Sequence, residues 1–347
     1  MRSWQWGIGF VIIGLAAVVV AMLGGLFRVS KSPEAENVAW TLPKLSGIVV
    51  VAQESENKTL LVTWNPANDA TQVLATWNLS DRRMTHLAVS ENGEQLVMAF
   101  TTGEEAITRI EVMNAGSDVS ELYGISDTPL SELRVASDAI WYRVDTTWYT
   151  ISFATQDTNR ITGRAGDLAI LDHGREVSYI KHSSDNAIDD VLATRVRTLN
   201  GRFGSEHTVL ERVSAVTPQS DSELLVIQHT EDASMPQLLL TTLRGERIRT
   251  IADIPLSQEE TNHLAIDPSP SRSRIAIIGT TRSVFVDGDE ATIEQLSGTP
   301  IAWMNEDRML VLDSTEYHLI LWDAAMRSRA SLPALISSNV VSASFLP

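Results

Sequence analysis

The last strand-like stretch of the chain, 339–345, is the feature that most limits its possible folds. It is short, apolar and rich in β-branched residues, which is typical of a β-strand. The unit that begins near Ser46 contains only three such stretches, whereas each of six later units contains four. We therefore predict that the tail supplies the missing strand of the first unit and closes the chain into a ring.

The six later units follow one another at intervals of 35 to 50 residues, with first strands near residues 86, 133, 168, 213, 263 and 300. Many apolar runs are continuous, as in Gly47–Ala52, which is typical of strands that are covered on both faces. Gly, Asn, Asp and Ser clusters separate the runs. This pattern predicts an all-β domain at 46–347, a seven-bladed β-propeller whose four-stranded blades bury their apolar faces against one another.

Three short motifs resemble known propeller families. The Ser-Glu-Asn-Gly sequence at 90–93 resembles the start of a Tol-type blade, and its Asn-Gly pair predicts a tight hairpin. The Met-Asn-Ala-Gly sequence at 113–116 resembles a turn of the same family, and Trp-Asp at 322–323 resembles the end of a WD-repeat strand. The resemblance implies a propeller with a protein-binding or scaffold role, by analogy of fold.

The N-terminal residues 7–27 carry no charged side chain. At about 1.5 Å per residue, a helix of this length spans roughly 31 Å, which is close to the thickness of a bilayer core. The segment is longer than the apolar region of a signal peptide, which is about 7–15 residues. We therefore predict one transmembrane helix at 7–27 after a short head at 1–6.

The residues that flank this segment are those that anchor a helix at the membrane surface. They are Trp4, Trp6, Arg28 and Lys31. A short head and a large C-terminal domain predict a single-pass signal anchor with an extracytoplasmic domain, periplasmic or extracellular. Because the basic residues at the two ends nearly balance, a docking platform that faces the cytoplasm stays open as an alternative. Residues 28–45 are predicted to be a linker, in which Trp40 is the candidate for a contact with a partner.

Charge and cysteine content exclude several classes of function. The formal net charge is −17, and the basic residues before position 32 leave −20 for the remainder. An acidic body repels phosphate backbones, so we predict no binding of nucleic acid. The chain has no cysteine, which excludes disulfides, thiolate metal sites and a cysteine nucleophile.

No catalytic, phosphate-binding or metal-binding motif is found, so we predict neither enzymatic activity nor a cofactor. His86 and His263 fall at matching positions, each at the start of an innermost strand, and are candidates for the rim of the channel. The alternative is a structural hydrogen bond at a blade edge. The acidic pairs at 189–190 and 259–260 are interpreted as solvated loop residues. The acidic stretch 286–290 is interpreted as a hairpin tip, with calcium binding as the alternative.

These observations predict a membrane-anchored propeller that binds a partner protein as a scaffold subunit of a membrane or envelope complex. The alternatives are a small-molecule binder that uses the mouth of the channel, or a propeller enzyme. Clustered acids, histidines or arginines at the channel mouth would favour these alternatives. A bland channel with an apolar patch on the outer rim would favour the scaffold.

Overall fold

The computed structural model describes residues 41–102, 107–136, 139–182, 190–198, 202–230, 235–256, 260, 264–279, 282–287, 292–296, 298–313, 318–330, 332–337 and 339–345. The chain divides into two units, Met1–Val38 and Ala39–Pro347, and every described residue belongs to the second. The predicted membrane segment 7–27, its flanking residues and Trp40 lie outside the described residues. Within the described ranges, no helix is long and apolar enough to cross a membrane.

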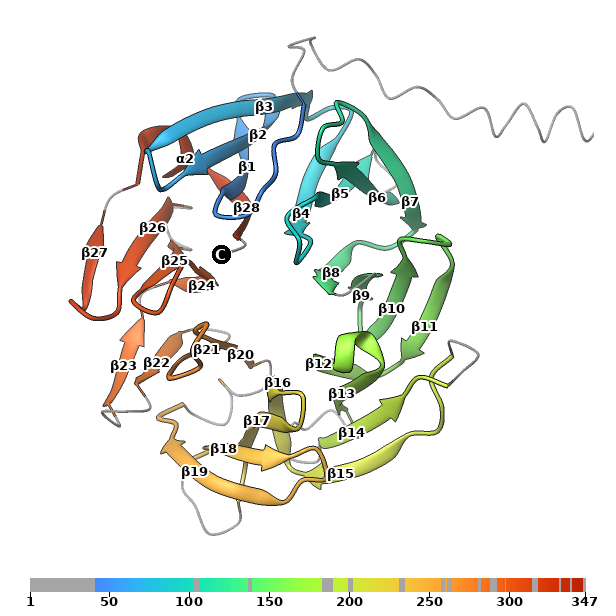
Figure 1. The fold of residues 1–347 in the computed structure, drawn as a ribbon, viewed down its shortest axis with the longest axis vertical. Helices are drawn as coiled ribbons and strands as arrows, with labels where there is room; N and C mark the ends of the chain where they lie inside the picture. Colours follow the sequence, from blue (N-terminus) through green and yellow to red (C-terminus); the bar gives the residue numbers. More distant parts are fainter. Residues whose placement is uncertain are drawn as a thin grey trace, which may run out of the picture. The chain divides into compact units, whose positions relative to one another are not determined.

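In the part of the chain that the structure describes, 28 strands form seven antiparallel sheets of four strands each. Figure 1 shows the sheets arranged around a central axis. Blade 1 contains β28 (Val340–Phe345), β1 (Val49–Ser55), β2 (Lys58–Asn65) and β3 (Ala70–Asn78). Blade 2 contains β4 (Arg83–Val89), β5 (Gln95–Thr102), β6 (Ile107–Asn114) and β7 (Ser120–Ser126). Blade 3 contains β8 (Leu130–Ala136), β9 (Ala139–Val144), β10 (Thr147–Ser152) and β11 (Thr158–Thr162).

The remaining four blades repeat this order. Blade 4 contains β12 (Ala165–Leu171), β13 (Glu176–Lys181), β14 (Val191–Val196) and β15 (His207–Glu211), with η1 (Asp172–Gly174) after β12. Blade 5 contains β16 (Val213–Ser220), β17 (Glu223–Gln228), β18 (Gln237–Thr242) and β19 (Arg247–Asp253). Blade 6 contains β20 (Ala265–Pro268), β21 (Arg274–Ile278), β22 (Ser283–Asp287) and β23 (Thr292–Leu296). Blade 7 contains β24 (Thr299–Trp303), β25 (Arg308–Asp313), β26 (His318–Asp323) and β27 (Ser328–Ala330), and the short helix α2 (Ala334–Ser337) leads into β28.

The predicted closure of the ring is confirmed. The C-terminal strand β28 pairs antiparallel with β1, so that Val51 lies opposite Ala343. In Figure 1, β28 is the innermost strand of blade 1 and lies beside β4 of blade 2. The hydroxyl of Ser342 accepts a hydrogen bond of 3.2 Å from the backbone N–H of Leu87 in β4. The last strand therefore completes one blade and also contacts the next.

The continuous apolar run of β1 is explained by its position between two neighbouring blades. Alternate side chains of a strand point to opposite faces of the sheet. Val50 and Ala52 belong to the core cluster shared with blade 2, whereas Val49 and Val51 belong to the cluster shared with blade 7. All four are fully buried. Because both faces are covered, neither set of positions is polar.

The described end of the predicted linker, 41–45, packs against the ring. Leu42 and Leu45 are buried in the cluster of blades 1 and 2. The N–H of Leu45 donates to the carbonyl oxygen of Gly93 at 2.8 Å, and the N–H of Gly116 donates to Leu42 at 2.8 Å. Gly93 has a φ of +70°, and a Cβ there would lie 2.7 Å from the backbone nitrogen of Ser46. The two motifs that resemble Tol-type blades therefore form the hairpins of blade 2 that hold this segment.

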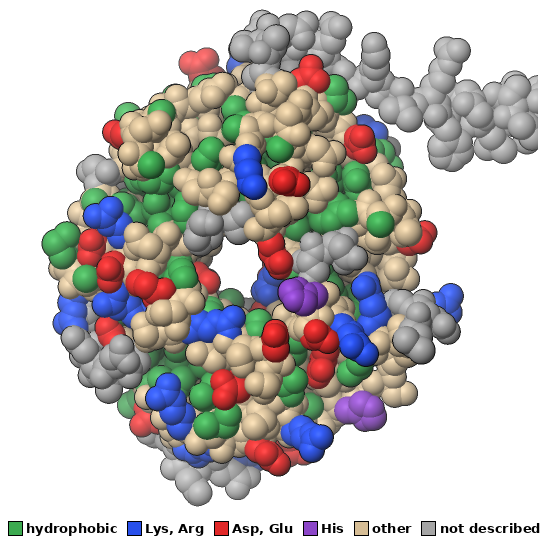
Figure 2. Space-filling view, in the orientation of Figure 1, with side chains coloured by type: hydrophobic (Ala, Val, Ile, Leu, Met, Phe, Trp, Pro, Cys, Tyr) green, Lys and Arg blue, Asp and Glu red, His purple; other side chains and the backbone are tan. Residues whose placement is uncertain are grey.

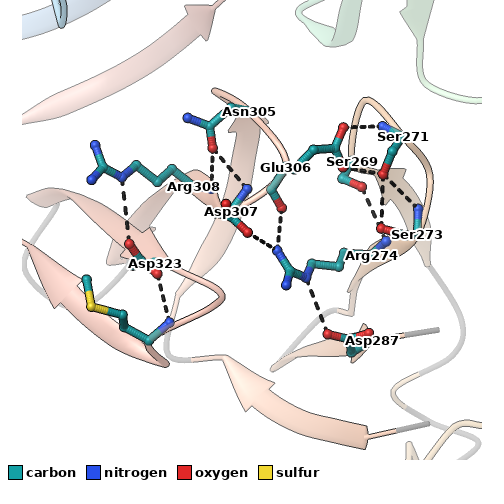
Figure 3. Close-up of polar contacts among 11 residues, drawn as sticks. Ser269, Ser271, Ser273, Arg274, Asp287, Asn305, Glu306, Asp307, Arg308 and Asp323 are labelled. Atoms are coloured by element: carbon teal, nitrogen blue, oxygen red, sulfur yellow. Dashed lines mark hydrogen bonds and ion pairs between the residues drawn. The ribbon is translucent and has the colours of Figure 1, made fainter. Parts of the chain in front are cut away.

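The Trp-Asp pair at 322–323 ends β26, the third strand of its blade, as the resemblance to WD repeats implies. The carboxylate of Asp323 accepts from the N–H of Met326 at 2.8 Å and lies 3.6 Å from Arg308, which closes the turn toward β27 (Figure 3). The Trp322 ring packs edge-on against Phe285 of blade 6, with ring centroids 4.7 Å apart.

Polar contacts between the hairpins of blades 6 and 7 reinforce this packing (Figure 3). Arg274 of β21 donates from Nη1 to the backbone oxygen of Glu306 at 2.9 Å and from Nε to Asp287 at 3.3 Å, and it also pairs with Asp307. Ser271 donates to the Glu306 carboxylate. Asp287, in the stretch for which calcium binding was the alternative, is therefore engaged by an arginine. Residues 288–291 of that stretch lie outside the described residues.

A buried ion pair joins blades 1 and 2 near the start of β4. The Arg82 guanidinium lies 2.5 Å from the Glu111 carboxylate, and both side chains are less than a tenth exposed. The same guanidinium lies 4.0 Å from the ring centroid of Phe100 and 5.9 Å from that of Trp77. Burial of two charges is tolerated because each has a close partner of opposite sign.

We expect Arg82→Gln to lower the free energy of unfolding by about 3–5 kcal/mol, because it leaves the buried Glu111 carboxylate without a cation. The matched control is Arg83→Gln, since Arg83 pairs with Glu54 at 2.6 Å but its side chain is 61% exposed. An exposed pair contributes about 0.2–1 kcal/mol. Urea unfolding of both variants measures the difference, and equal losses would contradict a stabilising role for the Arg82 contacts.

Candidate functional site

The innermost strands define two faces of the ring. The innermost strand of each blade begins on the same face of the ring, which we call the mouth face. These strands are β4, β8, β12, β16, β20, β24 and β28. Antiparallel second strands end on this face. The opposite face, which we call the hairpin face, carries the first-to-second and third-to-fourth connections, including 90–94 and 115–119. Figure 2 shows an opening at the centre of the ring with acidic and basic side chains near its edge.

A cavity of about 180 Å³ lies at the mouth face and is lined by residues of blades 3 to 6. Six polar side chains, which we call the mouth cluster, are contributed by the beginnings of β8, β12 and β16 and by the ends of β9 and β13. They are Glu132, Arg134, Arg143, Asp167, His182 and Ser214. Leu264 and Ala265 of blade 6 add an apolar strip. The blade repeat thus brings side chains together that are up to 133 residues apart in the sequence.

Arg134 is the centre of the mouth cluster. Its Nη2 lies 2.8 Å from Asp167, its Nη1 donates to the backbone oxygen of Leu168 at 2.6 Å, and it also pairs with Glu132. Burial works against the charged form of Arg134, but the charges of Glu132 and Asp167 hold its pKa above the ordinary value. Arg134 therefore remains a cation that ties blade 3 to blade 4.

Trp148 of β10 positions both arginines of the mouth cluster. Its ring is buried, with Arg134 at 5.4 Å and Arg143 at 5.7 Å from the ring centroid, distances typical of cation–π contacts. Its Nε1–H donates to the backbone oxygen of Gly166 at 2.8 Å. Arg143 lies 3.3 Å from Glu132 through Nη2, whereas its buried Nε has no hydrogen-bond acceptor within the described part of the chain.

His182 and Asp190 form a second pair beside the cavity. Nδ1 of His182 lies 2.6 Å from Oδ2 of Asp190, and the Asp190 side chain is 2% exposed. The interpretation of Asp190 as a solvated loop residue is therefore wrong. The buried carboxylate pairs with a histidine eight positions earlier in the chain. The adjacency of two aspartates in the sequence does not predict this contact. Asp189 lies outside the described residues.

Asp267 in β20 carries a carboxyl group whose pKa is raised. Burial raises its pKa to about 7, and the positive charge of Arg134 acts in the opposite direction. Its carboxylate makes no hydrogen bond among the described residues, while its backbone oxygen accepts from Trp303 at 3.0 Å. The innermost strand of blade 6 therefore carries a carboxyl group whose pKa is raised to near neutral pH.

Of the two predicted rim histidines, the structure describes His86. It lies within β4, three residues after the strand begins. Burial lowers its pKa, while the charge of Glu132 and the backbone of Ser131 act to raise it, so His86 is near the mouth cluster. Its Nδ1 is buried without a hydrogen-bond partner in the described ranges. His263, like Trp40, lies outside the described residues, and the predicted pair stays a prediction.

A second cavity of about 180 Å³ opens on the hairpin face. It is lined by residues at the hairpins of blades 2 to 6, including His173, Asp221 and Arg272. The backbone of Asp172 and His173 has positive φ values of 43° and 50°, which are uncommon for residues other than glycine. Because this cavity lies on the opposite face, substitutions on that face can serve as controls for experiments on the mouth cluster.

No family model and no curated protein matches this chain. Solved structures match it in fold. A protein of unknown function from Desulfotomaculum acetoxidans DSM 771 is 11% identical, with a TM-score of 0.55 over 85% of this chain and 97% of that chain. This chain is a seven-bladed β-propeller.

Two further solved structures match this chain over most of its length. Puromycin hydrolase is 12% identical, with a TM-score of 0.54 over 87% of this chain and 54% of that chain. TolB from Acinetobacter baumannii is 11% identical, with a TM-score of 0.48 over 88% of this chain and 68% of that chain. Identities this low show a shared fold alone, so the role of this propeller must be argued from its own site.

The raised pKa of Asp267 predicts how stability depends on pH. Its folded pKa of about 7 is above the ordinary value of 3.8, so the folded propeller holds a proton that the unfolded chain releases. The contribution of this group to stability is therefore present at low pH and is lost as the pH rises toward 7 and above. We expect Asp267→Asn to become more stable relative to the wild type between pH 5 and pH 8. Urea unfolding at both pH values measures this, and an offset independent of pH would contradict it.

Proposed function

We propose that this chain is a membrane-tethered β-propeller that recognises a polar ligand with the mouth cluster and acts by binding. The observation that carries the proposal is the cavity at the mouth face, where two arginines, two carboxylates, a histidine and a serine converge from three blades. Charged residues at the channel mouth are the feature that favours a ligand-binding propeller over a scaffold that uses only its rim. A rigid ring that presents side chains from several blades is suited to recognition.

The charges of the mouth cluster support binding more than catalysis. Glu132 and Asp167 are both tied to Arg134, so either carboxylate would have to leave an ion pair before it could take a proton from a substrate. The cluster therefore resembles a preorganised set of hydrogen-bonding groups.

The proposed tether precedes the described part of the chain. The described chain begins at Thr41 and runs along the hairpin face of blade 2, where Leu42 and Leu45 bond to the two hairpins. The uncharged segment 7–27 lies before this point in the sequence. We propose that this segment anchors the chain in a membrane and that the propeller is extracytoplasmic.

A second candidate function is the binding of a partner protein by the outer rim, as the scaffold prediction has it. The outermost strand of blade 2, β7, and the residue before it expose three large apolar side chains: Val119 at 62%, Leu122 at 39% and Ile125 at 57%. Exposed apolar side chains on an edge strand are typical of protein contacts.

The binding proposal predicts that the full chain, isolated from its native membranes in mild detergent, carries a small molecule detectable by native mass spectrometry. We expect Arg143→Gln to lose it, because the substitution removes a donor of the mouth cluster. Arg175→Gln, whose side chain is 71% exposed in the hairpin of blade 4, should retain it. If both variants carry the same molecules as the wild type, the mouth cluster is not the binding site.

The scaffold candidate predicts the opposite pattern in the same isolation. A stoichiometric protein partner that is lost in Val119→Asp with Ile125→Asp, and retained in Arg143→Gln, would place the working surface on the rim of blade 2. Since both apolar side chains are exposed, these substitutions should leave the urea unfolding midpoint nearly unchanged.

The tether predicts that the full chain sediments with membranes and resists extraction by alkaline carbonate. Deletion of residues 1–40 should release a folded propeller into the soluble fraction, because the seven sheets that the structure describes are built from residues after position 40. The near-ultraviolet circular dichroism of the released domain reports whether it is folded. Extraction of the full chain by carbonate alone would contradict the tether.

A further inference from the structure

The mouth cluster contains hydrogen-bond donors that the described chain leaves without acceptors. The Ser214 side chain is 7% exposed, lines the cavity, and its Oγ has no hydrogen-bond partner among the described residues. The buried Nε of Arg143, which also lines the cavity, likewise has no hydrogen-bond acceptor among the described residues. A buried donor without an acceptor costs about 1–3 kcal/mol, so a native protein that holds two beside one cavity is suited to a ligand that supplies acceptors.

The charges of the site argue against an ionic ligand. Arg134 is shared by Glu132 and Asp167, Arg143 pairs with Glu132, and Asp190 is covered by His182. The positive groups are thus already neutralised, and the propeller as a whole is strongly acidic. An anion would meet the acidic field of the ring, and a cation would compete with arginines that hold their carboxylates closely. A neutral ligand with oxygen acceptors fits these charges best.

The volume and polarity of the cavity further limit the class of ligand that it can bind. Its volume of about 180 Å³ corresponds to roughly six water molecules at about 30 Å³ each, which is below the roughly 300–1,000 Å³ of sites for drug-sized ligands. The polar groups come from blades 3 to 5, whereas Leu264 and Ala265 of blade 6 are apolar. A pyranose ring has this same division, with hydroxyl groups around its edge and C–H groups on its faces.

We propose that the mouth cluster binds one neutral pyranose unit of a saccharide. Ser214 and the Nε of Arg143 donate to hydroxyl oxygens of the sugar. Leu264 and Ala265 contact the C–H face of the ring. This inference rests on the proposed binding function and adds the chemical class of the ligand to it.

The test uses isothermal titration calorimetry on the full chain in detergent with defined probes. The neutral probes are methyl α-D-glucopyranoside, methyl α-D-galactopyranoside and methyl α-D-mannopyranoside. Glucuronate, glucosamine and acetyl-triglycine amide are the anionic, cationic and peptide comparisons. We expect at least one neutral pyranoside to bind more tightly than all three comparison probes.

Ser214→Ala provides the decisive variant. Removing a buried hydroxyl without a partner should leave the unfolding midpoint unchanged or raised, yet it should weaken sugar binding about five- to tenfold through the loss of one hydrogen bond. Thr241→Val is the matched control, because Thr241 in β18 also has a buried hydroxyl without a described partner but does not line the cavity. It should bind the sugar like the wild type.

The possible outcomes separate the inference from the proposed function. Binding of the anionic, cationic or peptide probe in place of the neutral sugars, with a loss in Ser214→Ala, would overturn the saccharide assignment and leave the mouth as a binding site. Equal sugar affinity in the wild type and Ser214→Ala would also overturn the assignment. Failure of every probe to bind, together with no molecule isolated from native membranes, would overturn both.

Discussion

The pairing of β28 with β1 is the interaction on which the rest of the structure depends. Each blade has two apolar faces, and a row of seven blades would leave the first and last faces exposed. Closing the ring covers both, and it does so with a strand from the far end of the chain. Val49 and Val51 on one face of β1 then meet blade 7, while Val50 and Ala52 meet blade 2. The channel and its mouth have a defined shape only because this closure holds the seven innermost strands in a circle.

The blades could be predicted from sequence because their signals are local. Asn92-Gly93 marks a hairpin, Trp322-Asp323 marks the end of a third strand, and continuous runs such as Val49–Ala52 mark strands between two sheets. The predicted first strands begin within about three residues of the observed ones. The closing strand was predictable for a different reason, since the first unit contains one strand fewer than the others.

The mouth cluster could not be predicted in the same way, because its contacts lie between blades. Arg134 and Asp167 are one blade repeat apart, and Ser214 is a further repeat along the chain. Each looks alone like an ordinary polar residue near a strand end. One signal was present in the sequence: innermost strands are expected to be apolar, yet Arg134, Asp167 and Asp267 place charges within three of them. The ring holds Arg134 and Asp167 close enough to neutralise each other, and in the proposed site the donors of Arg143 and Ser214 are left for the ligand.

The most direct test of the closure of the ring is a disulfide crosslink engineered between β1 and β28. The chain has no cysteine, so Val51→Cys with Ala343→Cys introduces one pair of thiols at positions that lie opposite each other. Opposed residues in an antiparallel pair have Cα atoms about 4.5–5.5 Å apart, within the range of a disulfide. We expect near-complete crosslinking on mild oxidation, measured by mass spectrometry after proteolysis, whereas Val51→Cys with Ser344→Cys should remain reduced because neighbouring side chains point to opposite faces. Crosslinking of the shifted pair, or of neither pair, would contradict the closure of the ring.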